Sequence, residues 1–218
     1  MFKRTAAVLL LAAAIVHAES GSDGDVLTAH DREGNIATAF NQFDGRVHSI
    51  QVNRLTAQGY NLWTDLHADG YDEMAYAAAM DPLGGIYLAG VRKQNRQKNF
   101  LVIKYNQNGG LEWEQTDDAS NCTATHLDAD REGDVVAAGV CRTGGSYPAR
   151  VVKYGNNGGF QWAQEYDGGG RNYIRGFSID YTGTISVSVE TVFGNYRDGS
   201  YVTRTVIYSP YGQQLEVR

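Results

Sequence analysis

Histidines and carboxylates are the side chains of this sequence that could hold a metal ion or transfer protons. Two histidines, His30 and His126, fall near the ends of segments that we expect to lie closest to a central axis, so a metal or acid–base role at that axis stays open. The other two histidines beyond residue 18, His48 and His67, follow no pattern. Carboxylates in the connecting segments could gather at the mouth of the same axis and bind a cation such as calcium: Asp72, Glu73, Asp117, Asp118 and Asp167.

The sequence contains none of the motifs that would assign a reaction. It has no nucleophile elbow, no His-Glu-x-x-His pair and no Walker loop. We therefore favour a noncatalytic protein without a cofactor. The alternative is a small enzyme or metal-binding protein that uses the axial channel.

The two cysteines of the chain flank one turn symmetrically. Cys122 lies eight residues before Asp130, and Cys141 lies eight residues after Gly133. If the strands on either side of this turn pair symmetrically about it, the two side chains lie opposite each other and suit a disulfide. A bulge at Gly133 would shift the register and place the cysteines on opposite faces. We predict the disulfide, because two thiols without a nearby pair of histidines make a poor zinc site.

Tyrosine, arginine, asparagine, glycine and aspartate occur together in the segments that escape the repeat pattern of this chain. Tyr buries a large area at a small entropic cost, and Arg presents a planar fork of donors, so this mixture is typical of binding surfaces. We predict that a face made of these loops binds a protein or a glycan, and the alternative is that the loops are merely solvated. A formal net charge of −6 disfavours nucleic acid. The residues expected to contact the partner are Arg92, Lys93, Arg96, Lys98, Tyr147, Arg171, Tyr173, Tyr196, Arg197 and Tyr201.

An Asp-x-x-Gly phrase recurs four times at a spacing of about fifty residues, and a second phrase places Trp four residues after Gly. An Asp at the first position of a type I turn accepts backbone N–H groups, and Gly tolerates positive φ, so we interpret the first phrase as structural turns. Recurrence at this period indicates stacked repeats that bury their apolar faces on one another. The turn residues are Asp31 and Gly34, Asp81 and Gly84, Asp130 and Gly133, and Asp180 and Gly183; the tryptophans are Trp63, Trp113 and Trp162.

Each repeat contains four short apolar segments separated by turn residues. In the second repeat these are residues 74–80, 86–91, 100–105 and 111–114, which predicts a four-stranded antiparallel meander. The first segment consists of small side chains and the Trp lies in the last, which matches the taper of a propeller blade from axis to rim. The sequence therefore predicts an all-β, four-bladed β-propeller whose tryptophans pack between blades.

The second and third repeats share two longer motifs. Gly84-Gly85-Ile86-Tyr87-Leu88-Ala89-Gly90 and Val102-Ile103-Lys104-Tyr105-Asn106 lead to the Trp of the second repeat, and Val151-Val152-Lys153-Tyr154 leads to that of the third. These motifs resemble the SBBP-type β-propeller repeats of bacterial exported proteins, over about residues 27–218. The first repeat departs with Arg54-Leu55 in place of Lys-Tyr, and the fourth has no Trp. The resemblance implies an architecture and carries over no catalytic residues.

The beginning of the chain has the composition of a secretory signal peptide. Basic Lys3 and Arg4 precede an apolar run over 6–16, and small residues near 18 suit a cleavage site. We expect an exported protein, periplasmic or extracellular, with no membrane span. If four blades do not close a ring alone, a second copy could complete it as a homodimer. The expected parts are a signal peptide over 1–18, a polar segment over 19–26, and a propeller over 27–218 with repeats at 27–73, 74–121, 122–172 and 173–218.

Overall fold

The computed structural model describes residues 25–194 and 199–218, and in these residues it contains sixteen strands and no helix. The strands form four antiparallel sheets of four strands each, and every sheet is a simple meander in chain order. This confirms the all-β prediction and its four-stranded units. Because the expected signal peptide lies outside the described residues, the structure does not address it. No helix in the described ranges is long and apolar enough to cross a membrane.

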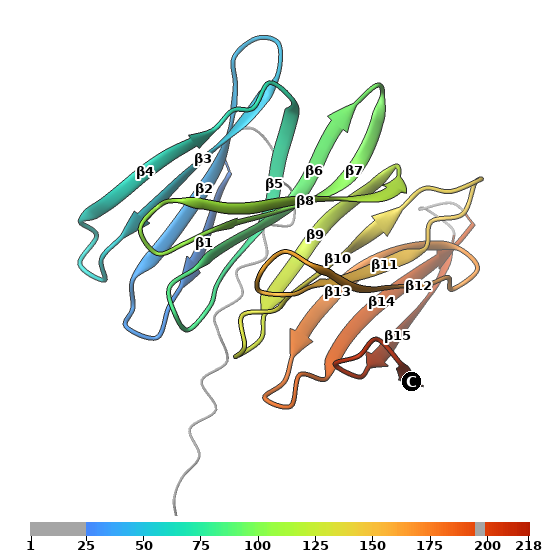
Figure 1. Cartoon of the computed structure of the whole chain (residues 1–218). Coiled ribbons are helices and arrows are strands. Elements are labelled where there is room, and N and C mark those ends of the chain that lie inside the picture. Colours follow the sequence, from blue (N-terminus) through green and yellow to red (C-terminus); the bar gives the residue numbers. More distant parts are fainter. Residues whose placement is uncertain (1–24, 195–198) are drawn as a thin grey trace, which may run out of the picture.

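We call the four sheets blades one to four (Figure 1). Blade one comprises β1 (Val26–His30), β2 (Ile36–Phe43), β3 (His48–Leu55) and β4 (Asn61–His67). Blade two comprises β5 (Asp72–Met80), β6 (Ile86–Gln94), β7 (Gln97–Tyr105) and β8 (Leu111–Ser120). Blade three comprises β9 (Cys122–Ala129), β10 (Val135–Cys141), β11 (Ala149–Tyr154) and β12 (Phe160–Tyr166). Blade four comprises β13 (Arg171–Ile179), β14 (Ile185–Phe193), β15 (Ser200–Tyr208) and β16 (Gln214–Val217).

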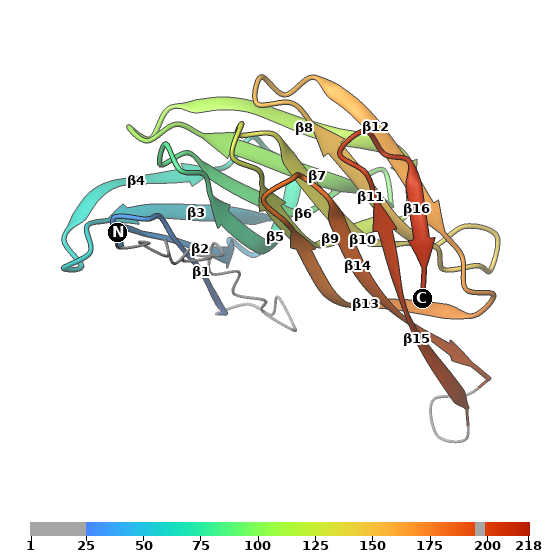
Figure 2. The ribbon, with the colours of Figure 1, turned by 90° about the horizontal axis from the view of Figure 1, so that it is seen from below.

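The blades stack in chain order as an open, propeller-like fan (Figures 1 and 2). The first strands lie innermost, since β5 packs against β1 on one side and β9 on the other, and β9 in turn packs against β13. Extensive strand contacts join blade one to two, two to three and three to four, but within the described residues none joins blade four to blade one. The axis is therefore open on one side.

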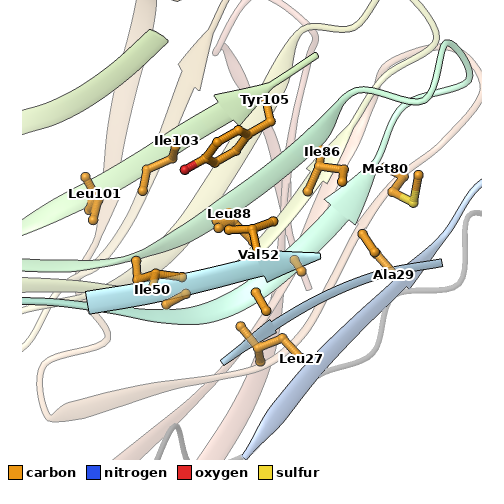
Figure 3. Packing of buried hydrophobic residues seen from close by; sticks show 14 residues of the cluster. Leu27, Ala29, Ile50, Val52, Met80, Ile86, Leu88, Leu101, Ile103 and Tyr105 are labelled. Carbon is orange, nitrogen blue, oxygen red and sulfur yellow. The ribbon is translucent and has the colours of Figure 1, made fainter. Parts of the chain in front are cut away.

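Three apolar clusters fill the spaces between successive blades. Figure 3 shows the first, in which Ile50 and Val52 of blade one face Leu88, Leu101 and Ile103 of blade two. Blades two and three are covered on both faces, so their strands read as continuous apolar runs. The end blades are covered on one face only, and their strands alternate between buried and partly exposed side chains.

The four Asp-x-x-Gly phrases form tight turns between the first and second strands. In the second, Asp81 Oδ1 accepts the backbone N–H groups of Leu83 and Gly85, both at 2.8 Å. The aspartates of the other three phrases accept the equivalent pairs of N–H groups. The glycine that ends each phrase has a φ near +80°, a conformation that a side chain would strain. The four glycines are Gly34, Gly84, Gly133 and Gly183.

Each tryptophan lies on the next blade, at the turn between its third and fourth strands. Trp63 Nε1 donates to Gln107 O at 3.0 Å, Trp113 Nε1 donates to Asn156 O at 2.9 Å, and Trp162 Nε1 donates to Pro210 O at 3.0 Å. The indoles cover glycines where a Cβ would lie within 3 Å of the ring: Gly109, Gly158 and Gly212. These contacts repeat at all three blade junctions.

Cys122 and Cys141 form a disulfide, as predicted, and pair directly across β9 and β10. The one-residue register shift that could have separated the cysteines is present at the turn, but a second shift along the strands compensates for it. The turn shifts the register by one residue, so that Val135 pairs with Ala129, and a bulge between Ala138 and Gly139 shifts it back. The same bulge recurs between the first two strands of blades two and four. A Cβ on Gly139 would lie 1.9 Å from Thr123 O, so a side chain there would push the two strands apart.

Candidate functional site

One side of the fan, which we call the loop face, carries the connections that vary between repeats. These run between the second and third strands of each blade and between successive blades. The tight turns lie at the opposite ends of the strands, on what we call the turn face. The described loop-face connections are residues 44–47, 68–71, 95–96, 121, 142–148 and 167–170.

Tyrosine–arginine pairs lie along the loop face of blades three and four. The ring of Tyr147 has the guanidinium carbons of Arg171 and Arg142 at 5.5 Å and 5.9 Å from its centroid, and Tyr173 has that of Arg175 at 5.3 Å. These cation–π contacts hold the rings in place. Arg175 also donates from Nε and Nη2 to Glu190 Oε1, at 3.1 Å and 2.7 Å. Arg171 is exposed, and it belongs to the set predicted from the sequence.

Three further predicted contact residues are exposed in or next to neighbouring connections. Arg96 and Lys98 lie at the tight β6–β7 connection, where Asn95 and Arg96 both have positive φ. Tyr201, in β15, is 71% exposed. Tyr196 and Arg197, also predicted, lie outside the described residues.

Lys93 and Arg92, by contrast, already have partners within the protein. Lys93 Nζ lies 2.8 Å from Asp72 Oδ2, and His48 Nδ1 lies 2.5 Å from the other oxygen of that carboxylate. Burial would raise the pKa of Asp72, but the bonds from Lys93 and His48 outweigh it and lower the pKa to about 2. The Arg92 side chain is only 11% exposed, and carboxylates surround it.

The surroundings of Arg92 form the densest group of titratable side chains at the loop face, which we call the His67 cluster: His67, Asp69, Glu73, Arg92 and Glu114. His67 ends β4, Asp69 lies in the connection between blades one and two, and the others come from blade two. Arg92 Nη2 donates to Asp69 Oδ2 at 2.7 Å and also to Glu114 Oε1, while Arg92 Nε donates to Glu73 Oε1. The cluster therefore joins the loop-face ends of the first two blades.

His67 faces the two carboxylate oxygens of Glu73 and Glu114 to which Arg92 does not donate. Its Nε2 lies 2.9 Å from Glu73 Oε2 and 2.9 Å from Glu114 Oε2. Burial alone would lower the pKa of His67, but the two carboxylates outweigh it and raise the pKa to about 9. Burial would likewise raise the pKa of Glu114, yet His67 and Arg92 lower it. Imidazole nitrogen and carboxylate oxygens are also the donors of many metal sites.

The other groups predicted to act at the axis do not join this cluster. His30 ends β1 next to the turn face, and His126 is buried in β9 with its ring 6.5 Å from that of Phe177. Asp117 bonds Arg150, whose Nη1 also reaches Glu165, and Asp167 accepts from Ser146. The Asp118 side chain lies outside what the structure describes.

Sequence reasoning named Glu73 and Arg92 for separate roles and missed His67, Asp69 and Glu114. A signal was available in the repeats, because the residue after the tryptophan is Thr64 in the first, Glu114 in the second and Ala163 in the third. A charged residue at a position that is otherwise uncharged indicates a role outside the repeat scaffold. Strand register then brings it to Glu73, which no spacing in the sequence predicts.

Comparisons with known proteins identify a fold and no family. No family model matches the sequence, and no curated protein matches it either. The SBBP resemblance therefore stays a prediction. Among solved structures, an acylaminoacyl peptidase in complex with Z-Gly-Gly-Phe-chloromethyl ketone matches with a TM-score of 0.51 and 9% identity over 88% of this chain. Our chain spans 32% of that peptidase chain, and the likeness is one of fold alone.

Two further structures match with lower scores. The mannose phosphorylase MPT-4 from Leishmania mexicana, in complex with phosphate ion, has a TM-score of 0.44 at 9% identity, over 95% of this chain and 71% of its own. The acylaminoacyl peptidase of Pyrococcus horikoshii has a TM-score of 0.46 at 8% identity, over 88% of this chain and 36% of its own. At these scores neither likeness carries an argument about function.

Proposed function

We propose that this chain is an exported, noncatalytic, propeller-like module that binds a protein partner through its loop face. The observation that carries the proposal is the row of tyrosine rings with arginines stacked on them, at Tyr147 and Tyr173, with the exposed Tyr201 beside them in blade four. Tyr and Arg are the residues most often found at the energetic centres of protein interfaces. The rigid sheets beneath them reduce the entropy lost on binding.

A protein fits this face better than a glycan does. Small ligands are held in concave sites, and a pocket of about 450 Å³ lies instead on the turn face, lined by Asp81, Lys104 and Asn156 among others. The tyrosines of the loop face extend over two neighbouring blades, which suits a broad partner surface. Export is supported by the disulfide, which persists in oxidising compartments.

The test is retention of a partner by the immobilised chain from an extract of the envelope and medium of the source cells. We expect wild-type protein to retain a defined protein, and Tyr147→Ser with Arg171→Ser to lose it. Tyr181→Ser with Tyr211→Ser is the matched control, because these tyrosines are 79% and 89% exposed on the turn face. Equal loss in both double variants, or retention by neither wild type nor variant, would contradict the proposal.

A further inference from the structure

We propose that His67, Glu73 and Glu114, with Asp69 as a fourth donor, form a site for a divalent transition-metal ion such as Zn²⁺ at the junction of blades one and two. The site would close the loop-face end of a junction that apolar packing fills and that Trp63 bonds at the turn face. This inference is independent of the proposed partner binding, which uses residues of blades three and four.

The donor atoms converge on one point. One ligand atom from each of the four residues lies within 4.8 Å of all the others. Within that set, His67 Nε2 lies 2.9 Å from Glu73 Oε2 and from Glu114 Oε2. Donor atoms that share a tetrahedral metal at about 2.0–2.2 Å lie roughly 3.3–3.6 Å apart, so small side-chain shifts would bring these atoms to ligand positions.

Two of these atoms are buried without a hydrogen-bond partner among the described residues. The side chains of His67 and Glu73 are 6% and 1% exposed, and neither His67 Nε2 nor Glu73 Oε2 makes a hydrogen bond. The imidazole is thus near both carboxylates without directing its nitrogen along a hydrogen bond to either. A buried polar atom left in this way costs free energy, and a bound cation would satisfy both atoms at once.

Arg92 prepares the site rather than filling it. It donates to Glu73 Oε1 and Glu114 Oε1, which leaves the Oε2 atoms of both carboxylates toward His67. Hydrogen bonds of this kind orient metal-binding carboxylates. A metal on Nε2 would displace the proton of His67, and three carboxylates and one guanidinium then sum to a charge of −2, which matches a dication.

The donor set selects the class of metal. Calcium and magnesium prefer oxygen ligands alone, whereas zinc and its neighbours accept a mixture of imidazole nitrogen and carboxylate oxygen. One histidine with two or three carboxylates therefore favours Zn²⁺ over Ca²⁺. Four residues also suit the tetrahedral arrangement of zinc sites.

The experiment is titration of the purified, metal-free chain, without a histidine tag, with ZnCl₂ by calorimetry and with CoCl₂ by absorption spectroscopy. We expect one Zn²⁺ per chain, a melting temperature that rises with Zn²⁺ and not with Ca²⁺, and visible Co²⁺ bands of a four-coordinate site. His67→Ala and Glu114→Gln should each weaken Zn²⁺ binding by more than about 100-fold. The matched controls are His30→Ala and Glu165→Gln, which remove the same side-chain types elsewhere and should bind as wild type does.

Three results would overturn the proposal. They are no heat with Zn²⁺, a Co²⁺ spectrum equal to that of the free ion, or unchanged binding in His67→Ala. The wild-type Co²⁺ spectrum decides the matter even if a cluster variant fails to fold. Loss of Zn²⁺ binding in Tyr147→Ser would instead link the two surfaces, and would contradict their independence.

Discussion

The ionised form of the Asp128 carboxyl group is disfavoured in the folded protein, because the side chain is buried without a cationic partner among the described residues to offset the loss of water. It lies in β9, is only 6% exposed, and accepts the backbone N–H of Ala129 at 2.8 Å. Burial raises its pKa from an ordinary 3.8 to about 7, with a further small contribution from the charge on Asp130. Near neutral pH the folded protein therefore holds a proton that the unfolded chain has already released.

The stability contributed by Asp128 should fall as the pH rises. Below about pH 4 both states bind the proton, whereas between about 4 and 7 only the folded state does, so the free energy of unfolding decreases across this window. We expect Asp128→Asn to raise the free energy of unfolding by roughly 2 kcal/mol at pH 8, and to have little effect at pH 4. Urea denaturation of both proteins at the two pH values measures the difference. An equal effect at both pH values would show that Asp128 is ionised when folded.

At the scale of elements, the contact between a tryptophan and the glycine of the next blade is the repeated unit of assembly. A Cβ on Gly158 would lie 2.8 Å from Trp113 Cγ. Gly59 occupies the same turn of blade one, with φ +85° against +81° for Gly158, yet a Cβ there would meet nothing within 4 Å. Comparing substitutions at the two glycines therefore distinguishes the effect of backbone strain from that of steric collision.

Gly158→Ala should destabilise the protein more than Gly59→Ala does. Both substitutions introduce the strain of a side chain at a positive φ, which costs about 1–2 kcal/mol. Only Gly158→Ala also pushes the indole of Trp113 away, which costs roughly 1–3 kcal/mol more. In a Trp113→Ala background this excess should vanish. Chemical denaturation of Gly158→Ala, Gly59→Ala, Trp113→Ala and the Gly158→Ala/Trp113→Ala double variant gives the coupling energy between Gly158 and Trp113. If Gly158→Ala still costs more than Gly59→Ala when Trp113 is absent, the contact with Trp113 is not the cause of the difference.

Much of each blade could be predicted from the sequence, because turns and alternation are local. Asp81 and Gly84 mark a turn whose hydrogen bonds span four residues, and Trp113 marks a rim strand. The bulge that restores the disulfide register could not be predicted with the same ease, although Gly90 and Gly139 sit at equivalent places in their repeats. A side chain at Gly90 or Gly139 would collide with a backbone carbonyl of the opposite strand, and no local sequence pattern encodes this contact.

At the scale of the whole molecule, the openness of the fan follows from a gap in the pattern. A closed ring would place a tryptophan of the fourth repeat over Gly59, but that repeat has Glu216 at the position of Trp162. Blade four thus lacks the tryptophan, and Gly59 of blade one lacks the covering indole, that a junction between these two blades would contain. The sequence thus contained the signal for an open array, whereas the composition of the His67 cluster depended on contacts between blades.

The end faces of the fan favour a single copy over a ring closed by two. On blade one, Asn53 Nδ2 donates to Thr38 Oγ1 at 3.0 Å, and Gln51 Nε2 donates to Asn53 Oδ1 at 3.1 Å. On β14 the buried Val187 and Val189 alternate with serines and Glu190 on the outer side. Polar outer faces are typical of the terminal units of repeat proteins.

We therefore expect the chain to sediment as a monomer at all accessible concentrations. Burying hydrogen-bonded polar faces would gain little free energy, because few apolar atoms would leave water. Sedimentation velocity over a dilution series measures this. A dimer that persists on dilution would favour the alternative in which a second copy completes the ring.

Within the described residues each blade shares extensive strand contacts only with its sequence neighbours, so the blades should also carry load one after another. A force applied to the two ends of the chain would act on the three junctions in series, so each blade could detach as a separate event rather than as part of a closed hoop. Blade three alone contains a covalent lock, since the disulfide spans a separation of 19 residues. In a single-molecule pulling experiment those residues would be withheld from extension, and the fully stretched chain would be about 60 Å shorter than after reduction.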